Sequence, residues 1–163
     1  MPYEKQFGTL GEIFGNTDLH GKLLSAAIGI PLNQVNRVTD LLFEINKTDG
    51  PFAGLFAYRF IKKSKATLAF THFDFTCILE LDGAFSDATK SFYTAVWNRL
   101  DKEGIPFTFH WGKMNELNID RITRMYGKNA DDWIAARNKL LDADSIKIFT
   151  NPLLQEWGLD KVI

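Results

Sequence analysis

The sequence is poor in the side chains that most often identify a protein's chemistry. It has one cysteine, Cys77, and three histidines among its 163 residues. A single cysteine excludes an internal disulfide and a cysteine-rich metal centre. The histidines, His20, His72 and His110, lie in separate segments, and none has a second histidine or cysteine at ligand spacing. The sequence therefore predicts no metal site, and Cys77 is expected to be an inert core thiol.

Long apolar runs and excess charge are missing as well. No apolar stretch reaches the roughly 18 residues of a transmembrane helix, and the first residues lack the apolar core of a signal peptide. The net charge is −1, which argues against the clustered positive surface that nucleic acid or an anionic membrane requires. These absences predict a protein without a membrane span or a nucleic-acid partner, in a reducing, cytoplasmic setting.

The standard catalytic signatures are also absent. The chain contains no nucleophile elbow, no P-loop, no dinucleotide-binding glycine motif and no zinc-protease motif. What it does contain is apolar and aromatic residues: 45% are hydrophobic, with 14 Phe and 4 Trp. A chain of this length and balance can form one domain with a large aromatic core.

Hydrophobic periodicity predicts an α+β fold. We expect helices over residues 32–46, 86–103, 118–125 and 133–141, and strands over 52–61, 66–70, 73–82 and 107–109. The tail, 146–163, is expected to be a short apolar strand or turn followed by a docking segment. This order predicts an antiparallel sheet with helices on one face, ferredoxin-like, plus additional C-terminal helices. Residues 1–31 are glycine-rich and are expected to be an irregular connecting segment that precedes a domain at 32–163.

Polar residues on the strands form the first candidate site. The strand at 52–61 is apolar on both parities and is expected to be covered on both faces, with Arg59 inside it. A buried guanidinium needs a carboxylate or an anionic ligand. Two interpretations are open: a structural Arg59–Glu80 ion pair, or a cleft lined by Arg59, Thr76, His110 and Lys113 that holds a hydroxylated substrate against an electron-accepting ring.

The segment 109–113, Phe-His-Trp-Gly-Lys, is the second candidate. It places an imidazole, an indole and an ammonium around one glycine at a strand end. It can be a hairpin corner with a buried Trp111 and a surface Lys113. It can also direct Lys113 toward a planar, anionic group.

From about Gly104 to the end of the chain, a series of short segments follows in order: Gly104-Ile105-Pro106, His110-Trp111-Gly112-Lys113, Ile122 to Gly127, Trp133 to Arg137, Leu140-Leu141-Asp142, Phe149-Thr150-Asn151 and Gly158-Leu159. In this series the chain resembles the C-terminal region of vanillyl-alcohol-oxidase-type flavoproteins, nearest the aldonolactone and alditol oxidases and related sugar or sterol oxidases. Residues 52–82 resemble the substrate-binding cap of the family more loosely, and residues 1–51 only weakly.

The resemblance implies a cap that closes over the isoalloxazine ring of FAD. It implies that Lys113 lies near the N1–C2 carbonyl edge of the flavin, with His110, Trp111, Gly112 and Asn151 as further cofactor-binding residues. Arg59 resembles the active-site arginine of the cap. Alditol oxidases have a glutamate two residues earlier, where this chain has Ala57, and this departure leaves the substrate undefined.

The sequence thus predicts the substrate-binding domain of an FAD-dependent oxidoreductase that acts on CH–OH groups. The candidate catalytic residues are Lys113, His110 and Arg59, and the candidate substrate-binding residues are Arg59, Thr76 and Glu80. The base is expected to be His110 or a group on a separate FAD-binding domain or subunit, for which residues 8–29 would be the join. Alone, the chain is expected to be inactive. The alternative is a free-standing ferredoxin-like interaction module, dimeric through an exposed sheet face.

Overall fold

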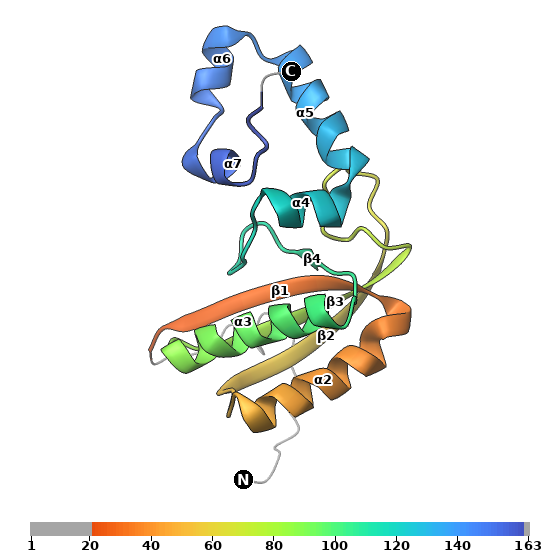
Figure 1. Cartoon of the computed structure of the whole chain (residues 1–163), viewed down its shortest axis with the longest axis vertical. Helices are drawn as coiled ribbons and strands as arrows, with labels where there is room; N and C mark the ends of the chain where they lie inside the picture. Colours follow the sequence, from red (N-terminus) through yellow and green to blue (C-terminus); the bar gives the residue numbers. More distant parts are fainter. Residues whose placement is uncertain (1–20, 162–163) are drawn as a thin grey trace, which may run out of the picture.

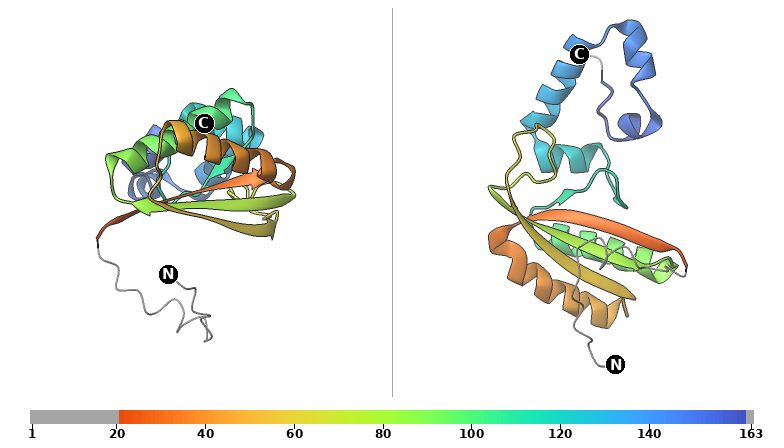
Figure 2. Two further views of the ribbon diagram at one scale, coloured as in Figure 1. Left: turned by 90° about the horizontal axis from the view of Figure 1, so that it is seen from below. Right: turned by 180° about the vertical axis from the view of Figure 1, so that it is seen from behind.

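The computed structural model describes residues 21–161, which fold around a four-stranded antiparallel sheet (Figure 1). The strands are β1 (Leu23–Pro31), β2 (Gly54–Lys62), β3 (Phe75–Ala84) and β4 (Thr108–Phe109), and their order in the sheet is β2-β3-β1-β4. Helices α2 (Val35–Thr48) and α3 (Asp87–Lys102) cover one face of this sheet (Figure 2). The order β1-α2-β2-β3-α3-β4 is that of a ferredoxin-like unit, so the predicted fold class is confirmed.

Strand β1 corrects the prediction that residues 1–31 form an irregular segment. Residues 23–31 pair along their whole length with β3, and β4 pairs with the other edge of β1. As a central strand, β1 is buried on both faces and shows no alternation of apolar and polar residues. Gly29 lies inside this strand and does not end it. A glycine is needed there because a Cβ would lie 2.5 Å from the carbonyl oxygen of Phe70. The other residues of that predicted segment, 1–20, lie outside the described residues.

The helices on the sheet follow their apolar periodicity. Three-residue helix η1 (Leu32–Gln34) leads into α2, whose Val38, Leu42 and Ile45 are buried against the sheet. Ser86 caps α3 by accepting a hydrogen bond from the backbone N–H of Thr89. Two of the helices expected from periodicity therefore build one layer of the core.

Strand β2 is exposed where the sequence predicted burial. It is the edge strand of the sheet, with β3 as its partner, and Leu55, Phe60 and Ile61 are largely exposed. The prediction that Arg59 is buried is therefore wrong. A run that is apolar on both parities does not by itself distinguish a central strand from an edge strand.

Two further segments differ from their predictions. Residues 66–70 are not a strand but part of the connection between β2 and β3, which folds against one end of the sheet. The tail is helical: Asp142 caps α6 (Ala143–Ile148) and Asn151 caps α7 (Pro152–Glu156), each accepting a backbone N–H bond. Short polar caps, which favour helix starts, outweighed the apolar pattern here.

The C-terminal helices form a lobe beside β4 (Figure 1). It comprises α4 (Ile119–Tyr126), α5 (Lys128–Leu140), α6 and α7. Trp111 links the lobe to the sheet, because its ring stacks on Tyr126 and contacts Trp157. Within residues 21–161, no helix is long and apolar enough to cross a membrane.

Candidate functional site

The face of the sheet opposite α2 and α3, here called the open face, carries most of the predicted site residues. Side chains alternate along a strand, and Cys77, Leu79 and Leu81 of β3 belong to the core under the helices. Their neighbours on β3 and the residues paired with them therefore share the open face. These are Thr76, Ile78, Glu80 and Asp82 of β3, Leu55, Ala57, Arg59 and Ile61 of β2, and Ser25, Ala27 and Gly29 of β1.

Glu80 is the centre of a charged cluster on this face. Its Oε2 lies 3.2 Å from Arg59 Nη2, and its Oε1 lies 3.5 Å from Lys113 Nζ. The Glu80 side chain is 12% exposed, that of Lys113 is 23% exposed and that of Arg59 is 67% exposed. The structural Arg59–Glu80 pair is therefore present, and it shares its carboxylate with the lysine of the predicted cleft.

Backbone pairing explains how Lys113 reaches this cluster. Beyond β4 the chain continues beside β1, since His110 N–H donates to the carbonyl of Ala27 and Met114 N–H donates to that of Ser25, both at 2.9 Å. Lys113 thus lies beside Ser25 and Ala27, two small residues of β1. Its side chain reaches Glu80 on β3, the next strand of the sheet.

Ser25 and Asp82 extend the cluster and were not predicted. They are directly paired across β1 and β3, and the Ser25 hydroxyl donates to the Asp82 carboxylate. Asp82 shares the strand parity of Glu80, so the sequence could have placed it on the same face. Its partner Ser25 could not be identified, because Ser25 lay in the segment predicted to be irregular.

His110 lies at the other side of Ala27 from Glu80. Its ring packs edge-on against Phe70, with centroids 4.9 Å apart, and its Nδ1 accepts a hydrogen bond from Gly112 N–H at 3.1 Å. In a neutral imidazole with Nδ1 as acceptor, the proton is on Nε2. In this arrangement the ring offers Nε2–H as a hydrogen-bond donor.

Three other predicted residues have structural partners. Thr76 is buried beneath the β2–β3 connection, and its hydroxyl donates to the carbonyl of Phe73 at 3.0 Å. Trp111 Nε1–H donates to the carbonyl of Leu68 at 2.8 Å. Asn151 uses its side chain to cap α7, in the C-terminal lobe (Figure 1). The structure does not bring these side chains to the exposed part of the Glu80 cluster.

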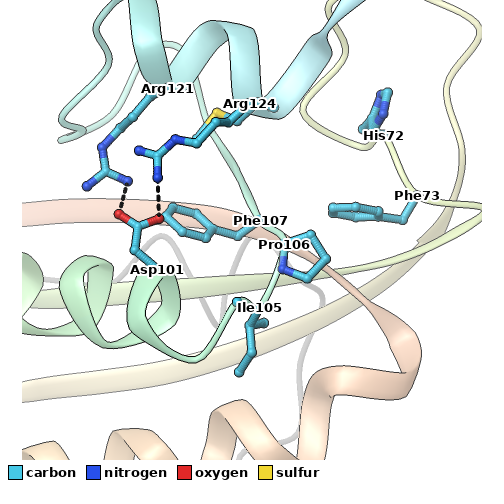
Figure 3. Close-up of a pocket in the computed structure, with 10 residues that line it drawn as sticks. His72, Phe73, Asp101, Ile105, Pro106, Phe107, Arg121 and Arg124 are labelled. Carbon is cyan, nitrogen blue, oxygen red and sulfur yellow. Dashed lines mark hydrogen bonds and ion pairs between the residues drawn. The ribbon is translucent and has the colours of Figure 1, made fainter.

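A hollow of about 440 Å³ between α3, α4 and residues 104–107 is a separate feature that sequence reasoning missed (Figure 3). Asp101 pairs there with Arg121 at 3.0 Å and with Arg124 at 3.3 Å. Arg121 also lies 3.5 Å from Glu116 and packs over Phe107. Two guanidinium groups facing two carboxylates leave no excess charge for a ligand, so this cluster is best explained as a link between α3 and α4.

Two further titratable groups, Cys77 and His72, have shifted pKa values. Burial raises the pKa of the Cys77 thiol, which fits an unreactive core residue. Burial, reinforced by Lys63, lowers the pKa of His72. Within the part of the chain that the structure describes, no group of three or more His, Cys, Asp or Glu residues could hold a metal ion.

Comparison with known proteins gives no match, either to a protein-family model or to a curated protein.

Proposed function

We propose that this chain is the substrate-binding, C-terminal domain of an FAD-dependent oxidoreductase that acts on CH–OH groups, and that its open face closes over the flavin. The observation that carries the proposal is the position of Lys113. Its ammonium lies on the open face, next to Glu80 and within the same cluster as Arg59. No helix of residues 21–161 covers this face (Figure 2).

The residues of the open face suit contact with a flat, electron-accepting ring. Ala57 is small and partly exposed, so there is little side-chain bulk beside Arg59 and Glu80, whereas Ala27 and Gly29 on β1 are buried. Lys113 has three N–H donors, and Glu80 is its one ion-pair partner among the described residues. FAD, held mainly by another domain or subunit, would supply a flavin ring as the hydride acceptor for a CH–OH substrate. Lys113 would stabilise the negative charge that develops on its side of the ring.

Glu80 and Arg59 would bind and orient the hydroxyl groups of the substrate. The position at which alditol oxidases have a glutamate is Ala57 in this chain, and Ala57 is directly paired with Glu80 across β2 and β3. A carboxylate is therefore present on the same face, one strand away. Glu80 would accept hydrogen bonds from substrate hydroxyls, and Arg59 would donate them.

The proton acceptor is better sought outside this chain. Nδ1 of His110 already accepts the Gly112 N–H, so the neutral ring presents an N–H rather than a lone pair to the substrate. Of the two bases considered from the sequence, this hydrogen bond favours the one on the separate FAD-binding part. His110 would then donate a hydrogen bond to substrate or cofactor.

Two measurements test the proposal. The coding sequence upstream of this chain is expected to contain a flavin-binding domain with a glycine-rich pyrophosphate loop, or a neighbouring gene is expected to do so. The complete protein is expected to be yellow and to lose its flavin absorbance when an alcohol substrate is added. A 163-residue chain that purifies with bound flavin and oxidises alcohols alone would contradict the proposed division of roles.

The edge strand favours a second candidate, an interaction module without catalysis. Leu55 and Ile61 are largely exposed on the open face of β2, and an unpaired apolar edge is a site at which a second strand can add. This candidate predicts a dimer that forms through β2 and binds no flavin partner. Light scattering on the chain, with Ile61→Lys as the variant that breaks the contact, distinguishes the two.

A further inference from the structure

A second hollow, of about 430 Å³, is lined by α5, by Phe149 just after α6 and by Leu154 of α7. Figure 1 shows these three helices in the C-terminal lobe. We call it the α5–α7 hollow. Its walls are almost entirely apolar, and they include Trp133, Leu140, Leu141, Phe149, Leu154 and one charged residue, Arg137. Small-molecule sites in proteins have this size and this combination of apolar walls with few polar groups. It is separate from the open face and plays no part in the proposed function.

Arg137 is the unusual member of this wall. The residue is 7% exposed, its Nη2 donates to the hydroxyl of Thr150, and its buried Nη1 has no hydrogen-bond partner. Among residues 21–161, no carboxylate forms an ion pair with it. Arg121 is buried to a similar extent, but it pairs with Asp101 and Glu116. A buried cation without a counter-charge is costly, so an anion would stabilise the described part of the lobe at this point.

We propose that the α5–α7 hollow binds a small monocarboxylate with an apolar tail, of which octanoate is a representative. The carboxylate would supply the missing counter-charge to Arg137, and a guanidinium binds a carboxylate through paired N–H bonds. The tail would cover Leu140 and Phe149, which are 83% and 63% exposed. Because Arg137 Nη1 is buried, these two side chains must move to admit the carboxylate, and their exposure means that little packing opposes the movement. A second copy of the chain would bring the same cation to the site and would leave the charge unbalanced.

The test uses the full chain and compares octanoate with octanamide, which has the same tail and no charge. NMR titration of the ¹⁵N-labelled protein, with the Trp133 indole N–H as reporter, is expected to show saturable octanoate binding. Octanamide is expected to bind at least tenfold more weakly, because a charge-assisted hydrogen bond is lost. Arg137→Gln is expected to lose the preference for octanoate, and Arg124→Gln, on the exposed side of α4, is expected to keep it.

A variant at the rim of the hollow gives a test that does not require Arg137→Gln to fold. Leu140 is mostly exposed, so Leu140→Gln should fold normally, bind octanoate several-fold more weakly and still prefer it to octanamide. If circular dichroism shows that Arg137→Gln is unfolded, the affinities of octanoate and octanamide for the wild type and for Leu140→Gln are compared instead. Equal affinity for both ligands, no saturable binding, or shifts remote from Trp133 would overturn the proposal. So would a dimer that Leu140→Gln disperses, since a second copy would then occupy the hollow.

Discussion

At the scale of single residues, Glu80 determines what the open face can do. One carboxylate with a mostly buried side chain holds two cations from different segments, Arg59 on β2 and Lys113 beyond β4. Either cation alone still neutralises Glu80, so each can engage a ligand without leaving a buried charge unpaired. This redundancy is the physical basis for expecting function, rather than stability, to respond to single substitutions here.

Lys113→Met tests the function of the cluster. In the complete protein, we expect flavin reduction by substrate to slow by about 2–4 kcal/mol of activation free energy, as for loss of one group that stabilises developing charge. Stopped-flow absorbance measures this rate. Lys90→Met on α3, an exposed residue that pairs with Asp87, is the control and should leave the rate unchanged. An unchanged rate in Lys113→Met would remove Lys113 from the site.

Arg59→Met tests whether the cluster supports the fold. Because Arg59 is largely exposed and Lys113 still pairs with Glu80, we expect a loss of unfolding free energy of only about 0.5–1 kcal/mol. Thermal and urea unfolding of the full chain measure it. A loss of about 3 kcal/mol or more would make Arg59 a structural residue.

The double variant Arg59→Met/Lys113→Met is expected to be non-additive. It leaves the Glu80 carboxylate without a cation, which should cost about 3 kcal/mol beyond the sum of the single changes. Adding Glu80→Gln should restore most of that loss, because the neutral amide needs no counter-charge. Simple additivity, measured by the same unfolding experiments, would show that Glu80 is adequately solvated without either partner.

At the scale of the elements, β1 positions the site. It pairs with β3 on one edge and with β4 on the other, and the segment after β4 follows it to Lys113. Gly29 of β1 also lets the β2–β3 connection approach the sheet, where Phe70 accepts a hydrogen bond from Thr108. The site therefore depends on a strand that carries few of its side chains.

Gly29→Ala tests this role of β1. The added methyl group would lie 2.5 Å from the carbonyl oxygen of Phe70 and 2.8 Å from Oγ1 of Thr108. Relieving these contacts must displace the β2–β3 connection, and we expect a loss of about 1–3 kcal/mol of unfolding free energy.

Gly112→Ala is the matched control, measured by the same urea unfolding. A Cβ at Gly112 would meet only the ring of His110, at 3.6 Å, and should change stability by less than about 1 kcal/mol. Equal losses in the two variants would contradict the close packing described at Gly29.

At the scale of the whole molecule, two parts are stabilised differently. The sheet with α2 and α3 encloses a continuous core, whereas α6 and α7 contain no buried residue. Tyr93 lies inside that core and donates to the carbonyls of Leu24 at 3.0 Å and Leu81 at 2.6 Å. It ties the central strands of the sheet to α3.

The raised pKa of Tyr93 makes the stability of the molecule depend on pH in the alkaline range. Burial, together with the negative charge of Asp82, raises its pKa to about 12, above the value of about 10 in an unfolded chain. Between these values the folded state holds the proton more tightly, so stability is complete below pH 10 and falls as the pH rises toward 12. The slope contributed by one tyrosine is at most about 1.4 kcal/mol per pH unit.

Urea unfolding of the wild type and of Tyr93→Phe between pH 8 and pH 11 measures this effect. The variant is less stable at neutral pH because it loses the hydroxyl and its hydrogen bonds, but its stability should decline less steeply above pH 10. Tyr126, whose pKa burial also raises, contributes equally to both proteins. Parallel curves would show that Tyr93 ionises as readily in the folded chain as in the unfolded one.

The sequence by itself determined the elements whose patterns are local. Periodicity placed the helices near α2 and α3, and strict alternation placed β3 with Glu80 opposite the core. These inferences succeed because caps, turns and one-sided burial leave a record within a few neighbouring residues. Charge reasoning gave the Arg59–Glu80 ion pair as one of two interpretations, and that pair is present, whereas the role of Lys113 stays a prediction.

The tertiary structure alone decided the rest. A central strand such as β1 is buried on both faces and carries no alternation, and exposure of the edge strand β2 depends on which strands pair. The meeting of Ser25 with Asp82, the cover over Thr76 and the absence of a counter-charge for Arg137 among residues 21–161 each depend on segments far apart in the chain. Long-range pairing fixes these features, and no pattern within one segment encodes them.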